Sequence, residues 1–86
     1  MENIDTAKLT KVALSVRRDI IKMLVAAGSG HSAGPLGMAD IFTALYFHIM
    51  NHDPKDPLWD DRDRLILSCG HICPVRYAAM AEAGYF

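Results

Sequence analysis

A glycine-rich break constrains the fold of this chain more than any other feature. Residues 28–37 read GSGHSAGPLG, with four glycines and one proline in ten positions. Glycine and proline disfavour a continuous helix or strand, so this stretch predicts an irregular loop. The chain is therefore divided here into separate elements, and the only large polar ring in the loop is His31.

The residues before the loop have a helical pattern. From Asp5 to Ala27, apolar side chains recur every three or four positions, which gives a helix one buried stripe. Asp5 or Thr6 can cap the start, and Gly28 can adopt the left-handed conformation that commonly ends a helix. The stripe consists of Leu9, Val12, Ala13, Val16, Ile20, Met23, Leu24 and Ala27.

The residues after the loop predict a second helix and an acidic loop. Residues 38–50 (MADIFTALYFHIM) are apolar on more than one face, which predicts a helix with neighbours on several sides. Residues 51–63 contain two prolines and several aspartates, which predicts a turn-rich loop. We interpret Trp59 as an anchor for this loop and Arg62 and Arg64 as partners of its aspartates.

The C-terminal third predicts a strand followed by a helix. Residues 64–68 (RLILS) form a short apolar run consistent with a buried strand of a parallel sheet. Pro74 suits the first turn of a following helix, and Gly84 can end it. Its apolar face would be formed by Val75, Ala78, Ala79 and Ala83. The order helix, loop, helix, strand, turn, helix is the opening of an α/β fold, and its single strand requires partners.

Composition excludes several classes of protein. Nine Lys and Arg balance ten Asp and Glu, and no basic cluster suggests nucleic-acid binding. No apolar run reaches the roughly 20 residues that span a bilayer. The acidic start of the sequence lacks the features of a signal peptide, so we expect a soluble, cytoplasmic protein.

The soft metal ligands of the chain are too few for a structural zinc site. Cys69, His71 and Cys73 alternate as C-G-H-I-C, but structural zinc requires four ligands. We expect both cysteines to be reduced thiols. The aspartates of residues 51–63 lack the spacing of a calcium loop, so no metal ligand is predicted in the chain. His48 and His52 are interpreted as packing or solvent residues.

Two Gly-His pairs are the candidate functional residues: Gly30-His31 in the glycine-rich loop and Gly70-His71 after the predicted strand. Open α/β sheets bind ligands in loops beyond the carboxyl ends of their strands. A helix that begins near Pro74 would present backbone N–H groups to an anion, and an imidazole could add a hydrogen bond. For each histidine alone, a structural role remains an equal alternative.

Three separated motifs carry a resemblance to a known family. SGHSAGPLGMADIF, the DP-K-DP-x-W-DDRDR-LILS segment and CGHICPVRYAAMAEAGYF resemble the first part of the transketolase family in order and spacing. The sequence departs from the family at Ser32 and Ala33, where many relatives have Pro-Gly. It also departs at Cys69, where Asn is frequent, and at Arg76, where an aliphatic residue is common.

The resemblance implies a function for both histidines. It implies that His31 lies by the reacting centre and contacts the sugar substrate, and that His71, with Gly70, contacts thiamine diphosphate and substrate. The implied reaction moves a two-carbon ketol unit between sugar phosphates, with Mg²⁺ or Ca²⁺ holding the diphosphate. The implied fold is the N-terminal piece of a doubly wound, mainly parallel thiamine-diphosphate-binding domain, of which residues 1–86 would form an incomplete part.

The resemblance also implies partners. The metal-binding Gly-Asp-Gly segment, a further substrate histidine and the glutamate that activates the cofactor would lie downstream of Phe86. We therefore expect the remainder of the subunit, a pyrimidine-binding partner domain and an oligomer to complete the site. Two alternatives remain open: a related deoxyxylulose-phosphate synthase, and a non-catalytic scaffold fragment.

Overall fold

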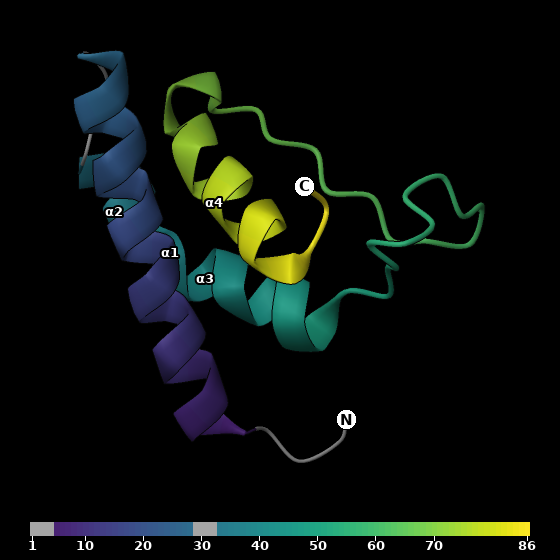
Figure 1. Cartoon of the computed structure of the whole chain (residues 1–86). Coiled ribbons are helices and arrows are strands. Elements are labelled where there is room, and N and C mark those ends of the chain that lie inside the picture. The colour runs from purple at the N-terminus through teal and green to yellow at the C-terminus, as the bar shows by residue number, and fades with distance from the viewer. Residues whose placement is uncertain (1–4, 29–32) are drawn as a thin grey trace.

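The computed structural model describes residues 5–28 and 33–86, and within these ranges it is helical with no β-strand (Figure 1). The elements are α1 (Thr6–Ala27), α2 (Ala33–Gly37), α3 (Ala39–Ala44), the π-helical turn η1 (Leu45–Ile49), the 3₁₀ turn η2 (Gly70–Ile72) and α4 (Cys73–Ala83). Residues 50–69 connect η1 to η2 without regular secondary structure. None of the described helices is long and apolar enough to cross a membrane.

The first helix confirms the prediction from its sequence. The carboxylate of Asp5 accepts a hydrogen bond from the backbone N–H of Lys8 at 3.0 Å, which satisfies one of the unpaired donors at the helix start. At the other end, Gly28 has φ +69° and its N–H bonds to the carbonyls of Leu24 and Val25. Glycine is needed there because side chains rarely adopt this conformation.

A small apolar core joins α1 to the other helices. α1 lies along α4 on one side and crosses α3, so that the three helices enclose the core (Figure 1). Buried side chains come from each of them: Val16, Ile20, Ala39, Phe42, Tyr46, Val75, Ala78 and Ala79. On α1 the buried positions are part of the predicted stripe, whereas Ala27 at the end of that stripe is exposed.

The prediction of an irregular loop across residues 28–37 is wrong for its second half. Residues Ala33–Gly37 form the short helix α2, with Pro35 buried. Proline is compatible with this position because the first four N–H groups of a helix have no partner within it. Within the described residues, the break therefore contains a turn of helix that the glycine and proline content alone did not indicate.

The predicted helix over residues 38–50 forms, but its hydrogen-bonding changes along its length. α3 becomes the π-helical turn η1 at Leu45, and the N–H of Met50 bonds to the carbonyl of Leu45 at 2.8 Å. Phe42 and Tyr46 face the core, whereas Ile41 and Ile49 are about half exposed, at 52% and 51%. Only one face of this apolar helix is covered by the described residues.

The acidic loop, residues 51–63, is held at its base and not by its tryptophan. Asn51 and Asp63 bond reciprocally: the N–H of Asp63 donates to the carbonyl of Asn51, and the N–H of Asn51 donates to the carboxylate of Asp63, both at 2.7 Å. Trp59 is 38% exposed, so its interpretation as an anchor is wrong. The predicted pairing of Arg62 and Arg64 with aspartates is also not found, because both donate to backbone carbonyls of the loop.

The predicted strand at residues 64–68 is not confirmed. In the described part of the chain this segment runs back from the acidic loop to the start of α4 without sheet hydrogen bonds (Figure 1). Leu65 and Leu67 pack against the core, whereas Ile66 between them is 88% exposed. This alternation is that of a strand with one face covered. A strand requires a partner strand for its backbone hydrogen bonds, and the described residues contain none.

The final helix, α4, confirms the prediction. Pro74 lies in its first turn, and Gly84 ends it at φ +101°. Val75, Ala78 and Ala79 are fully buried against α1 and α3, and Ala83 is half-buried. These small side chains allow the backbones of α4 and α1 to approach closely.

Candidate active site

The second Gly-His pair lies on a tight turn at the start of α4. Gly70 and His71 belong to the 3₁₀ turn η2 and are both exposed, and Ile72 beneath them is buried. A Cβ atom built on Gly70 would meet no other atom within 4 Å. The backbone at this turn is therefore open to a ligand, and the buried Ile72 fixes the turn to the core.

The start of α4 offers fewer backbone donors than the sequence predicted. The N–H of Ile72 donates to the carbonyl of Cys69 at 3.1 Å, and the N–H of Cys73 donates to the carbonyl of Gly70. Pro74 has no N–H. The 3₁₀ turn thus uses the donors that a helix N-terminus would otherwise present to an anion. The imidazole of His71 is the polar side chain of this turn, and it lies near the positive end of the dipole of α4.

The first Gly-His pair, Gly30 and His31, lies outside the described residues. Its C-terminal flank is described, and it contacts Ile72, the residue that follows the second pair. A Cβ atom built on Gly34 of α2 would lie 2.7 Å from Cγ2 of Ile72, a separation that side chains essentially never show. Glycine at this position allows α2 to lie against η2. The chain three residues after His31 is therefore fixed beside the turn that carries His71.

The turn is flanked by two thiols, Cys69 before it and Cys73 after it, and the phenol of Tyr77 follows on α4. Cys69 is exposed, Cys73 is half-buried, and both are free thiols in the structure. A hydrogen bond with Cys73 raises the pKa of the Tyr77 hydroxyl above its ordinary value. Across residues 5–28 and 33–86, no three His, Cys, Asp or Glu side chains are placed to hold a metal ion.

These residues fit one part of a thiamine diphosphate site and not all of it. Gly70 leaves room beside the backbone, and the exposed imidazole of His71 can hydrogen-bond a cofactor. A diphosphate held by a divalent cation additionally requires several oxygen ligands, which the described residues do not bring together. The turn is therefore suited to orient a cofactor whose charged end is held by other groups.

His52 is a structural residue. Its Nε2 lies 2.6 Å from the carbonyl oxygen of Tyr46, which can only accept, so Nε2 carries the proton. Nδ1 consequently accepts from the hydroxyl of Tyr85, 2.5 Å away. This pair connects the acidic loop to the end of α4. Sequence reasoning missed it, because Tyr85 is 33 residues from His52 and no local pattern links them.

Comparisons with known proteins agree with the motifs. Residues 9–86 match the family model described as transketolase, thiamine diphosphate binding domain. The chain is 44% identical over 71 residues to the 6-deoxy-6-sulfo-D-fructose transketolase subunit SqwG of Clostridium sp. (strain MSTE9), covering 83% of this chain and 26% of that protein. It is 39% identical over 85 residues to the chloroplastic transketolase of Solanum tuberosum, covering 99% of this chain and 12% of that protein.

A third relative matches most of the chain at a similar identity. The transketolase of Treponema pallidum (strain Nichols) is 43% identical over 74 residues, which cover 86% of this chain and 11% of the relative. The chain thus spans between 11% and 26% of the length of these three relatives.

Proposed function

Because the chain belongs to the transketolase family, within its thiamine diphosphate binding domain, we propose that it forms part of an enzyme that transfers a two-carbon ketol unit between sugar phosphates. In this proposal the chain contributes one corner of the site. The rest of the subunit and a pyrimidine-binding partner domain supply the remainder, as in an oligomer.

The observation that carries the proposal is the close approach of Gly34 to Ile72. This contact brings the flank of the first Gly-His pair against the turn of the second. We infer from this that the two imidazoles, which come from distant parts of the sequence, serve one ligand. A packing role for each histidine alone would not require this arrangement.

The residues have distinct proposed roles. His71 donates a hydrogen bond that orients the cofactor and the substrate, and Gly70 leaves space for the cofactor beside the backbone. His31 contacts the sugar near the reacting carbonyl, where an imidazole can move a proton. Bound thiamine diphosphate would supply the carbanion chemistry that breaks and forms the carbon–carbon bond.

Several features would come from outside the described residues. The ligands of Mg²⁺ or Ca²⁺ would lie in the remainder of the protein, as would strands that pair with residues 64–68. The alternating burial of Leu65, Ile66 and Leu67 supports a strand of an α/β sheet completed there. We propose the cytoplasm as the location of the completed enzyme.

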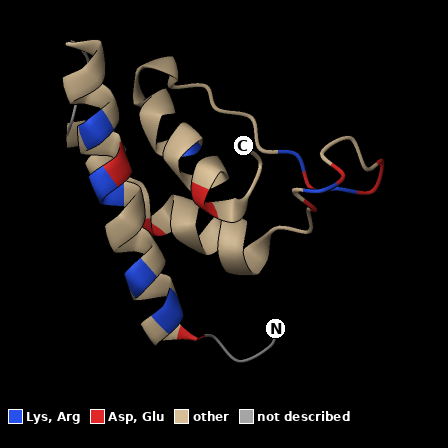
Figure 2. Ribbon diagram, in the orientation of Figure 1, with Lys and Arg blue, Asp and Glu red and all other residues tan. Residues whose placement is uncertain are grey.

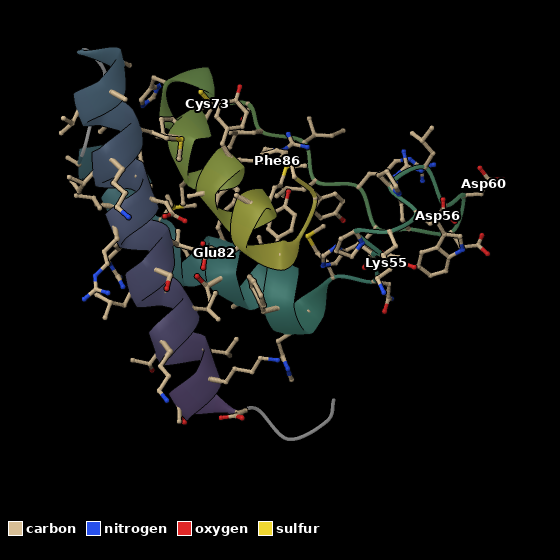
Figure 3. The ribbon with its side chains drawn as sticks, viewed as in Figure 1. Lys55, Asp56, Asp60, Cys73, Glu82 and Phe86 are labelled. Carbon is tan, nitrogen blue, oxygen red and sulfur yellow. The ribbon has the colours of Figure 1, made fainter. Side chains whose placement is uncertain are left out.

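The proposal is tested with His71→Asn in the complete protein. Loss of one hydrogen bond should weaken thiamine diphosphate binding by about tenfold, because such a bond contributes about 0.5–1.5 kcal/mol. Calorimetry with Mg²⁺ measures the affinity, and a two-carbon transfer assay measures turnover. Lys55→Gln, on the exposed acidic loop (Figure 3), is the control and should change neither quantity. Unchanged cofactor affinity and turnover in His71→Asn would contradict the assignment.

A comparison of turnover with a phosphorylated and a sulfonated sugar would identify the donor. The 44% identity to a protein named as a 6-deoxy-6-sulfo-D-fructose transketolase subunit favours a sulfonated sugar as a second candidate donor. A fructose phosphate and the sulfonated sugar both carry a tetrahedral anionic group at the same end of a ketose. Turnover with fructose 6-phosphate and with its 6-deoxy-6-sulfo analogue, measured side by side, distinguishes the two.

A further inference from the structure

A pocket lies on the other side of α4 from its contact with α1. It has a volume of about 280 Å³, near the lower end of the range for small-molecule sites. Its lining combines apolar side chains, including Tyr46, Met50 and Met80, with three arginines. Arg62 and Arg64 come from the region where the acidic loop ends, and Arg76 comes from α4.

Charges on this side of the molecule are separated in space. Acidic side chains occupy the outer part of the acidic loop, where Figure 3 shows Asp56 and Asp60 pointing away from the helices. Arginines occupy its inner end and the facing helix (Figure 2). Among the described residues, Asp63 is the only acidic one that lines the pocket, and its carboxylate accepts the N–H of Asn51 at 2.7 Å. The lining of the pocket therefore includes three arginines and one aspartate, and the aspartate is already engaged by Asn51.

Arg62 and Arg64 are held by hydrogen bonds to backbone carbonyls that leave most of their donors unused. Nη1 of Arg62 donates to the carbonyl of Trp59 at 2.7 Å. Nη1 of Arg64 lies 3.4 Å from the carbonyls of Asp60 and Arg62. A guanidinium has five N–H donors, so each keeps several. In the part of the chain that the structure describes, the ion pair between Arg17 and Asp40 is the only one, and none of the three arginines takes part in it.

Like charges that line one pocket without an ion-pair partner repel each other, and the repulsion is stronger where side chains are withdrawn from water. Arg62 and Arg76 are both half-buried. An anion in the pocket would remove this repulsion and would accept the unused donors. The planar fork of arginine matches the oxygens of a phosphate group better than any other side chain does.

We propose that the pocket between Arg62, Arg64 and Arg76 binds a small molecule with a tetrahedral oxyanion, such as a phosphate ester. The apolar side chains of Tyr46, Met50 and Met80 accommodate its carbon skeleton. Inorganic phosphate carries the same tetrahedral oxyanion without a carbon skeleton, so it is the second candidate ligand.

This pocket is separate from the turn that carries Gly70 and His71, which we call the histidine site. Arg62 and Arg64 precede or begin residues 64–68, whereas Gly70 and His71 follow that segment, so the two sites lie toward its opposite ends. Arg76 lies on α4, one turn after the helix begins at Cys73, whereas Gly70 and His71 precede the helix on η2. The lining of the pocket contains neither Gly70 nor His71, so the proposed anion site is distinct from that turn and does not depend on the reaction proposed above.

The test is calorimetry of the complete protein, in a phosphate-free buffer of low salt, with inorganic phosphate and with glycerol 3-phosphate. Both should saturate with dissociation constants in the millimolar range or tighter, and neutral glycerol should not bind. Arg76→Leu should weaken the binding of both anions by about tenfold or more, because it removes charge-assisted hydrogen bonds. Leucine is chosen because transketolases commonly carry an aliphatic residue here.

Three further variants show whether the arginine side chains of this pocket hold the anion. Arg18→Gln, exposed on α1, is the matched control and should change binding less than about twofold. His71→Asn should leave phosphate binding unchanged, which distinguishes this pocket from the histidine site. Arg76→Lys keeps the charge without the fork and should lose affinity while remaining folded. Tighter binding of glycerol 3-phosphate than of phosphate identifies an ester, and equal binding identifies the inorganic ion. Absence of saturation, or affinity unchanged in both Arg76 variants, would overturn the proposal.

Discussion

Gly34→Ala is the substitution for which the structure gives the clearest magnitude. The new methyl carbon would lie 2.7 Å from Cγ2 of Ile72, whereas ordinary contacts begin at 3.4 Å, so one side must move by about 0.7 Å. Ile72 is only 8% exposed and is branched at Cβ, so it has little freedom to rotate away. Overpacking of this kind costs about 1–3 kcal/mol.

Gly37→Ala is a matched control in the same short helix. A Cβ atom at Gly37 would meet nothing within 4 Å, so alanine there gains about 0.5–1 kcal/mol from its lower backbone entropy in the unfolded chain. Gly34→Ala shares this entropic gain, which therefore cancels in the comparison, so the free energies of unfolding in urea should differ by the overpacking cost of about 1–3 kcal/mol, with Gly34→Ala the less stable. Ile72→Ala is itself destabilising because Ile72 is buried, but in that background Gly34→Ala should cost less than in the parent protein, and the double-mutant cycle should show coupling of at least about 0.5 kcal/mol.

The same variants test function. If α2 is displaced from η2, the residues around the two Gly-His pairs move apart, and turnover of the complete enzyme should fall by roughly tenfold or more, since misplacement by about 1 Å can cost 10²-fold. Gly37→Ala should retain normal turnover. Equal stability of Gly34→Ala and Gly37→Ala, together with equal turnover, would refute the reasoning.

Further substitutions test the remaining assignments. His31→Ala in the complete enzyme should lower turnover by roughly 10²–10⁴-fold with an unchanged melting temperature, and near-normal turnover would refute its role. The hydrogen bond with Asp19 raises the pKa of Glu82, so the folded state binds this proton more tightly and stability falls as pH rises from the ordinary pKa of Glu82 through its raised value. Glu82→Gln should therefore stabilise the protein at pH 7 by less than about 1 kcal/mol, and the gain should vanish near pH 4; a constant gain across pH would contradict this. Cys69 and Cys73 should both react with a thiol reagent under native reducing conditions, and stoichiometric zinc in the purified protein would contradict their interpretation as free thiols. The isolated 86-residue chain should not bind thiamine diphosphate and Mg²⁺ at tens of micromolar, since a helix terminus contributes only about 0.3–1 kcal/mol, and tight one-to-one binding would contradict an incomplete site.

Local patterns predicted the two principal helices because local interactions determine them. The Asp5 cap, the Gly28 end and the buried stripe of α1 each depend on residues within four positions of one another. The same holds for Pro74 and Gly84 at the ends of α4. Such signals need no knowledge of the rest of the fold.

Features that depend on distant residues were predicted less well. Residues 64–68 have the composition of a strand, but a strand forms only when a second one supplies hydrogen bonds. Trp59 suggested an anchor, yet the loop is held by Asn51 with Asp63 and by His52 with Tyr85, which are far apart in sequence. The histidine motifs themselves were visible in the sequence, whereas the contact that joins their surroundings depends on the absence of a side chain at Gly34.

The reciprocal bonds between Asn51 and Asp63 have a consequence for engineering this protein. They close the acidic loop at its neck, so its outer part can change length without moving α3 or residues 64–68. Doubling the length of a flexible loop costs only about 0.6 kcal/mol in closure entropy. The exposed positions near Lys55 and Asp56 are therefore a suitable place to graft a fluorescent label, an affinity tag or a small folded module.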